Sequence, residues 1–167
     1  AADPGLRRVA VVFRLHAALF GRHEETYPQL PHEHTDAERA QVWEAYLGLL
    51  RKLVAEGKQV YVVLQAPELG KPVADLVRGA QKPSEVTGVT RAWWTARSSY
   101  VTARLRELPP EVTVLDPASL FCDAERCVAV THGVARYFDD DHYSIEGARE
   151  VARTLLDMAL ARERKAR

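Results

Sequence analysis

The feature that most constrains the fold is an alternation of apolar strands with a long amphipathic helix. Residues 9–13 form a continuous apolar run, as expected of a strand buried on both faces. Thr35 and Glu38 form a capping box that predicts the start of a helix, and Gly57 supplies its C-terminal stop. A second apolar run follows at 60–64. A strand, a helix and a second strand make a βαβ unit, whose crossover should be right-handed.

The rest of the chain continues this alternation. Residues 112–115 are a third apolar strand, and helical spacing predicts helices over 90–108 and 144–164. Segments 15–34 and 66–88 are predicted to be irregular, the first rich in Pro and His and the second in Pro and Gly. The sequence therefore predicts an α/β fold, a three-layer αβα sandwich around a parallel sheet. Ligands of such sheets bind beyond the carboxyl ends of the strands.

Length and charge exclude several classes of function. The 167 residues fit one domain better than two. Lys+Arg and Asp+Glu both number 23, so there is no basic excess for binding nucleic acid. No apolar run approaches the roughly 18 residues that a membrane span needs. We expect no nucleic-acid partner and no cofactor.

The stretch 138–144 is the most informative for chemistry. Asp139 stands three residues before His142, so its carboxylate can fold back and accept the imidazole Nδ1–H. That would leave Nε2 to take a proton from a hydroxyl nucleophile. We prefer Asp139 to Asp141, because the side chain of an adjacent residue does not easily curl under the ring. Ser144 is a good N-cap for the closing helix.

Two other interpretations of this stretch remain open. It could be a solvated acidic turn with one surface histidine. Three consecutive Asp residues also suit a bound cation, although we predict no metal site.

Cys122 and Cys127 are the only cysteines. Four intervening residues are too many for a CxxC redox motif, and a zinc site would need a second pair. A local disulfide in an oxidising compartment fits best, where it would shape the loop leading to His142. The alternative is a pair of unbonded buried thiols in a cytosolic protein.

The first long loop is rich in histidine. His32-Glu33-His34 is half of a metal site at most, and solvated loop histidines are favoured for the set His23, His32 and His34. Arg14 and His16 differ because they fall just past the first predicted strand. We expect one of them to enter the same crevice as His142 and to hold an oxyanion or a sugar hydroxyl.

These features resemble the SGNH hydrolase superfamily. The closest resemblance is to the periplasmic SGNH domain fused to acyltransferase-3 polysaccharide O-acetyltransferases. Residues 139–148 resemble its closing block, Asp-Asp-x-His-Leu-Ser-x-x-Gly-Ala, with Tyr143 in place of Leu. Cys122 and Cys127 resemble the two cysteines before that block, residues 60–68 resemble its strand ending in Val-Pro-Glu, and residues 11–14 resemble its strand ending near Arg-Trp.

The resemblance implies a flavodoxin-like sandwich and a Ser-His-Asp triad with Asp139 and His142 as acid and base. The family's Gly-Asp-Ser nucleophile block is absent from this chain, which also contains no Asn. We therefore expect residues 1–167 to be the C-terminal two thirds to three quarters of one SGNH-like domain that lacks its first strands. None of the chain's own serines lies in the strand-to-helix turn expected of the nucleophile; they are Ser84, Ser98, Ser99, Ser119 and Ser144.

The implied function is an O-acyltransferase or O-acetylesterase acting on a bacterial cell-envelope polysaccharide. Its partners would be an acylated glycan, an acyl donor, the missing N-terminal segment and a membrane acyltransferase domain of the parent protein. The expected location is the periplasm, tethered to the inner membrane through the parent polypeptide. The alternatives are an SGNH-like module that only binds glycan and a cytosolic α/β protein that binds a cation.

Overall fold

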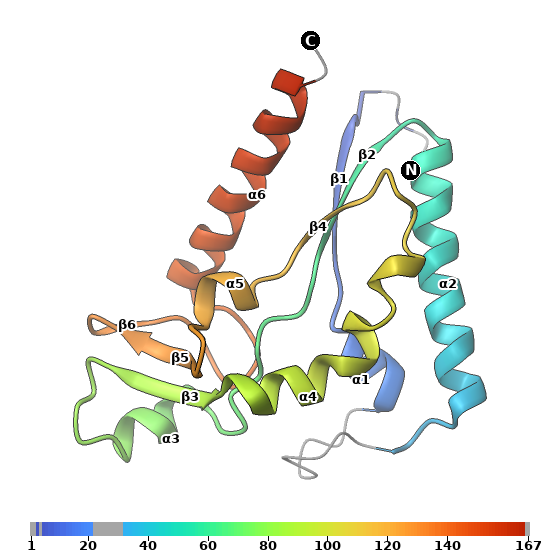
Figure 1. Cartoon of the computed structure of the whole chain (residues 1–167). Coiled ribbons are helices and arrows are strands. Elements are labelled where there is room, and N and C mark those ends of the chain that lie inside the picture. The colour runs from blue at the N-terminus through green and yellow to red at the C-terminus, as the bar shows by residue number, and fades with distance from the viewer. Residues whose placement is uncertain (1–2, 4, 22–31, 166–167) are drawn as a thin grey trace. The chain divides into compact units, whose positions relative to one another are not determined.

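A computed structural model of the chain describes residue 3 and residues 5–21 and 32–165 (Figure 1). Two compact units are formed, each from two segments of the chain. The first unit comprises Ala1–Gln65 and Ala96–Leu115, and the second comprises Ala66–Thr95 and Asp116–Arg167.

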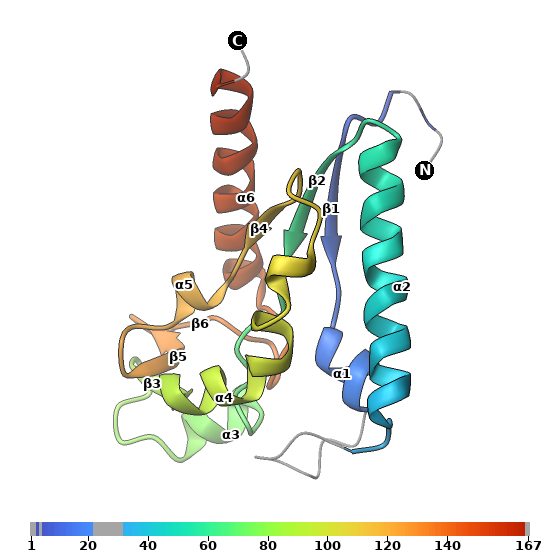
Figure 2. The ribbon, with the colours of Figure 1, turned by 45° about the vertical axis from the view of Figure 1, so that its right-hand side comes forward.

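The first unit is built on a parallel sheet. Strands β1 (Arg8–Val12), β2 (Gln59–Val63) and β4 (Thr113–Leu115) lie in the order β1-β2-β4. Helix α2 (Asp36–Ala55) runs alongside β1 and β2 in both ribbon views (Figures 1 and 2). A strand, a helix and a parallel strand form the predicted βαβ unit.

Apolar side chains of the sheet and of the neighbouring helices make the core of this unit. Its most buried members, each at most 5% exposed, are Leu15, Leu19, Phe20, Trp43, Leu47, Leu50, Leu53, Val60, Val62 and Val101. At about 25 cal/mol per Å² of apolar surface removed from water, this burial is the main source of stability for the unit.

The first strand is less buried than its sequence predicts. In the described part of the chain β1 pairs only with β2, so it is an edge strand. Val11 is buried, but Val12 is 60% exposed and the following Phe13 is 51% exposed. The prediction of a strand buried on both faces is therefore wrong for this strand.

The ends of α2 follow the sequence prediction. The Thr35 hydroxyl accepts a hydrogen bond from the Glu38 amide at 3.3 Å, and the Glu38 carboxylate accepts one from the Thr35 amide at 2.7 Å. Just past the helix, Gly57 adopts φ +74°, the left-handed conformation that glycine reaches at little cost. The capping box and the glycine stop are both confirmed.

The segment predicted as a loop over 15–34 begins with a helix. Helix α1 spans Leu15–Phe20, and Leu15, Leu19 and Phe20 are buried in the core. These apolar residues fold against α2, a tertiary contact that periodicity over six residues does not reveal. His23 lies outside the described residues.

The second unit contains an antiparallel sheet that the sequence did not suggest. Strands β3 (Val86–Thr90), β5 (Arg126–Thr131) and β6 (Val134–Ala135) lie in the order β3-β5-β6. The segment 66–88, predicted as irregular, contributes β3 and also helix α3 (Val73–Arg78). β3 has register shifts within its five residues, and a Cβ on its Gly88 would lie 2.3 Å from the Leu69 side chain. Such a bulged strand lacks the alternation that identifies strands.

The remaining helices match their predictions with altered ends. The helix predicted over 90–108 is α4 (Arg91–Thr102) followed by a 3₁₀ turn (Leu105–Glu107). After the short helix α5 (Ala118–Phe121), the closing helix α6 (Ile145–Lys165) begins at the predicted N-cap. The Ser144 hydroxyl accepts a hydrogen bond from the Gly147 amide at 3.0 Å.

The predicted fold class is confirmed: the chain has an α/β fold in which helices flank a parallel sheet. Among the described residues, no helix has the length and apolar character needed to span a bilayer.

Candidate active site

The loop between β6 and α6 is closed by its own backbone. Tyr137 and Tyr143 form an antiparallel bridge, and the Phe138 amide donates to the His142 carbonyl at 2.8 Å. Residues 139–141 form the turn that connects Phe138 to His142. The turn carries the three acidic side chains that the sequence places before His142.

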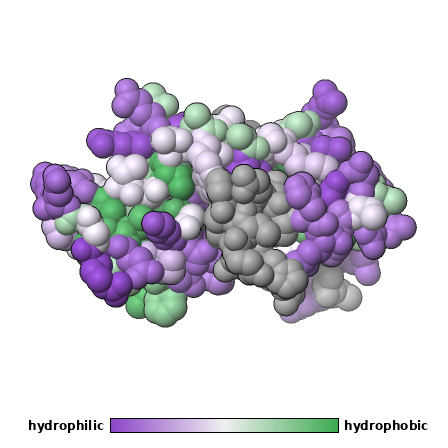
Figure 3. Space-filling model, turned by 90° about the horizontal axis from the view of Figure 1, so that it is seen from below, coloured by the Kyte–Doolittle hydropathy of each residue, from purple (hydrophilic) through white to green (hydrophobic). Residues whose placement is uncertain are grey.

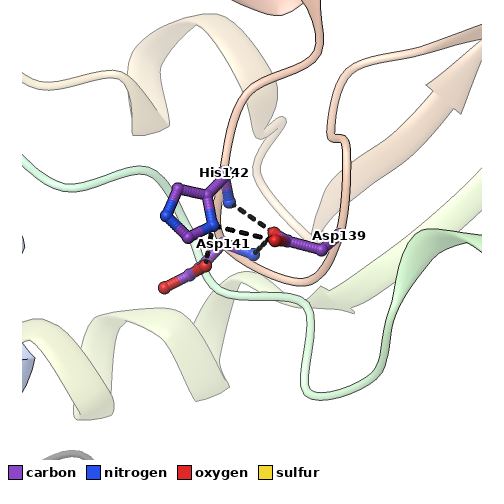
Figure 4. Close-up of side chains that lie close together, drawn as sticks. All are labelled: Asp139, Asp141 and His142. Atoms are coloured by element: carbon purple, nitrogen blue, oxygen red, sulfur yellow. Dashed lines mark hydrogen bonds and ion pairs between the residues drawn. The ribbon is translucent and has the colours of Figure 1, made fainter.

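Within this turn the Asp139 carboxylate and the His142 ring are directly bonded (Figure 4). Asp139 Oδ2 lies 2.8 Å from His142 Nδ1, while Oδ1 accepts the amide N–H of His142 at 2.8 Å and of Asp141 at 3.0 Å. A carboxylate can only accept in this geometry, so Nδ1 carries the ring proton and the lone pair of the neutral ring lies on Nε2. This is the tautomer that a general base requires.

The hydrogen bonds also set the charge of Asp139. Partial burial acts to raise its pKa, but the amides of His142 and Asp141 and the His142 ring stabilise the anion and lower it. The net effect holds the pKa of Asp139 below its usual value, so the carboxylate is ionised at neutral pH.

Asp141 lies closer to the ring than its position in the sequence suggests. Its Oδ1 is also 2.8 Å from His142 Nδ1, and its side chain is only 4% exposed (Figure 4). The expectation that the side chain of this adjacent residue would not easily curl under the ring is therefore wrong. The tight turn brings the adjacent carboxylate under the ring, so Nδ1–H faces two acceptors while His142 itself stays 66% exposed.

Two backbone hydrogen bonds anchor the turn to an earlier part of the second unit. The Val73 amide donates to the Asp139 carbonyl at 3.0 Å, and the Leu69 amide donates to the Asp140 carbonyl at 2.8 Å. Both donors lie in the segment that was predicted to be irregular. No pattern in the sequence predicts these contacts.

An aromatic cluster supports the loop from its buried side. Phe121 packs against Tyr137 and Tyr143, with ring centroids 5.9 Å and 5.6 Å apart. Phe121 and Tyr137 are each 1% exposed, and burial raises the pKa of Tyr137 and of Tyr143 above their usual values. Tyr143 stands where the closing block usually has Leu, and its ring packs against Phe121 at this position.

The predicted disulfide between Cys122 and Cys127 is confirmed. Cys122 immediately follows Phe121, and Cys127 is fully buried in a small core with Trp94 and Ala118. The crosslink thus ties the aromatic cluster to β5.

The turn also brings together side chains of the kinds that bind metal ions. In the described part of the chain, Asp139, Asp141 and His142 are the group whose potential ligand atoms lie within 4.8 Å of one another. While Nδ1 of His142 carries the proton that it shares with Asp139, Nε2 is the ring nitrogen that could bind a metal ion. His32-Glu33-His34 does not form such a group among the described residues, and His34 Nδ1 lies 3.1 Å from the Leu19 carbonyl.

Arg14 and His16 belong to the first unit. Arg14 directly precedes α1 and lines a depression of about 550 Å³ together with Phe13, Glu33 and His34. His16 is only 4% exposed and packs near the Phe20 ring, with centroids 6.4 Å apart. That Arg14 or His16 enters the same crevice as His142 stays a prediction.

Two of the chain's serine hydroxyls bond to backbone. Ser119 donates to the Asp116 carbonyl at 2.7 Å, and Ser144 donates to the Ala135 carbonyl at 2.6 Å. Each of these serines therefore serves the local structure of its own helix.

A histidine whose Nδ1–H is held by a carboxylate has Nε2 available to accept a proton, which is the arrangement needed to activate a hydroxyl nucleophile. A protein-family model described as the SGNH domain fused to AT3 domains matches residues 1–157, and the chain belongs to this family. Domains of this kind are typically extracytoplasmic. No curated protein and no solved structure matches the chain.

Proposed function

We propose that this chain carries the acid–base pair of a serine-type O-acyltransferase or O-acetylesterase domain acting on a bacterial cell-envelope polysaccharide. The observation that carries the proposal is the 2.8 Å bond from His142 Nδ1 to Asp139, in a member of the SGNH family. The family match spans both units, which supports treating residues 1–167 as part of one domain. The description of the family as fused to AT3 domains supports a parent protein with a membrane acyltransferase domain.

The proposed reaction has two halves that use the same base. A serine from outside these residues attacks the acyl carbonyl as its hydroxyl proton passes to His142 Nε2, and the imidazolium returns that proton to the departing alcohol or thiol. In the second half Nε2 takes the proton of a sugar hydroxyl or of water, whose oxygen attacks the acyl-serine; the acyl–serine bond breaks and the imidazolium returns the proton to the departing serine oxygen. Asp139 holds Nδ1–H throughout. Arg14 is our candidate for stabilising the oxyanion, with His16 as a second candidate.

Three variants of the parent protein test the acid–base pair. His142→Ala should lower acetyl transfer or ester hydrolysis by several orders of magnitude, as the loss of a triad member does. Asp139→Asn should cost somewhat less, because the Asp141 carboxylate also lies 2.8 Å from Nδ1 and can still accept its proton. Asp140→Asn is the matched control from the same turn and should cost little.

The 167-residue chain alone gives a second test. It should show little or no hydrolysis of p-nitrophenyl acetate, because the proposed nucleophile lies elsewhere. Efficient hydrolysis that His142→Ala abolishes would contradict this and assign the nucleophile to one of the chain's own serines. A parent protein that binds glycan with no turnover, and is unaffected by His142→Ala, would instead support a glycan-binding module.

A further inference from the structure

The loop that carries His142 also presents large apolar side chains to solvent. Few large hydrophobic residues of the described chain are strongly exposed, and the face shown in Figure 3 is mainly hydrophilic with separate apolar groups. The two most exposed are Phe138 at 78% and Ile145 at 73%. Both lie within four residues of His142. Large apolar side chains are usually buried in the core, and neither Phe138 nor Ile145 is.

The backbone of the loop determines which side Phe138 faces. Tyr137 and Tyr143 form a bridged pair whose rings pack inward on Phe121. In an antiparallel pair successive residues point to opposite sides, so the next pair, Phe138 and His142, faces outward. Their exposures of 78% for the Phe138 residue and 66% for the His142 side chain agree with this placement. Directly opposed residues have Cβ atoms about 5 Å apart.

We propose that Phe138 is a substrate-binding residue whose ring stacks on the sugar that carries, or receives, the acyl group. This inference rests on the proposed function. An exposed aromatic ring presents an apolar face, which suits the axial C–H groups of a pyranose. Its place beside His142 would hold a sugar hydroxyl or acetyl ester near Nε2. Ile145, in the first turn of α6, would extend the apolar rim on the other side of the histidine.

The test compares two acetyl esters that differ in whether they contain a sugar ring. The full parent protein is assayed by acetate release from glucose pentaacetate and from vinyl acetate, which has no ring. Phe138→Ala should raise KM for glucose pentaacetate about tenfold, which corresponds to a contact of about 1.4 kcal/mol, and leave KM and kcat for vinyl acetate unchanged. Phe138→Tyr should retain the KM of the wild type for glucose pentaacetate, since it keeps the aromatic face.

Leu156→Ala is the matched control, because Leu156 is also strongly exposed, at 54%, but lies further along α6. It should leave both esters unaffected. An unchanged KM for glucose pentaacetate in Phe138→Ala, equal losses on both esters, or wild-type turnover of vinyl acetate alone would overturn the role of Phe138. A wild-type protein that cleaves neither ester contradicts the proposed function itself, so the two failures are distinguishable.

Discussion

Replacing Gly147 by Ala should destabilise the second unit, although alanine is the better helix former. A Cβ at Gly147 would lie 2.2 Å from the Arg136 carbonyl oxygen, a backbone atom that cannot rotate away. The helix would have to move by about 0.8 Å merely to reach the 3.0 Å below which real Cβ contacts essentially never occur. The same carbonyl accepts the Ser144 amide at 3.0 Å, so the displacement also strains the N-terminus of α6.

The magnitude follows from opposing effects. Overpacking in a tight contact typically costs about 1–3 kcal/mol, a weakened hydrogen bond about 1 kcal/mol, and the gain in helix propensity offsets about 1 kcal/mol. We therefore expect a net loss of about 2 kcal/mol in the free energy of unfolding. Urea denaturation followed by far-UV circular dichroism measures it.

Gly48→Ala is the matched control for Gly147→Ala. Gly48 lies in the exposed middle of α2, and a Cβ there would meet nothing within 4 Å. This variant should gain up to about 1 kcal/mol from helix propensity alone. If Gly147→Ala proves as stable as Gly48→Ala, the close approach of α6 to Arg136 is not a constraint and the reasoning fails.

Two further predictions concern hydrogen bonds to side chains. Thr35→Ala removes the capping box of α2 and should lower the free energy of unfolding by about 1 kcal/mol, whereas Thr35→Ser should retain it; thermal melts of both variants decide. Because folding lowers the pKa of Asp139, its stabilisation is present above the unfolded pKa of about 4 and is lost as the pH falls through the folded value. In urea titrations between pH 6 and pH 3, the loss of stability should be larger in the wild type than in Asp139→Asn, by less than about 1 kcal/mol for a side chain that is 34% exposed.

The sequence predicts those helices and strands whose signals lie within their own boundaries. Strand β2 has a dense apolar run, and α2 carries both its cap and its stop within its own boundaries. Strands β3 and β5 are instead defined by each other across about 40 residues, and β3 bends around Gly88 where Leu69 approaches. Neither strand has an alternating pattern, so each is recognised as a strand only once its pairing with the other is known.

The same distinction between local and distant contacts applies to the candidate site. The spacing of Asp139 and His142 is local, and the bond between them was predicted. The approach of Asp141 to the same Nδ1 was not, because it depends on how tightly the Tyr137–Tyr143 bridge closes the turn. The amides of Leu69 and Val73 that hold the turn come from a distant segment and leave no mark near the histidine.

The contacts that orient His142 form an assembly within the second unit alone. Asp139 is fixed by three hydrogen bonds from the turn, and its carbonyl is held by Val73. The aromatic cluster and the disulfide support the loop from its buried side, and the Ser144 hydroxyl bonds to Ala135 of β6 and to the Gly147 amide of α6. None of these contacts requires a nucleophile to be present. The tautomer of His142 should therefore be set before any serine is delivered, so a downfield Nδ1–H resonance is expected from the 167-residue chain alone.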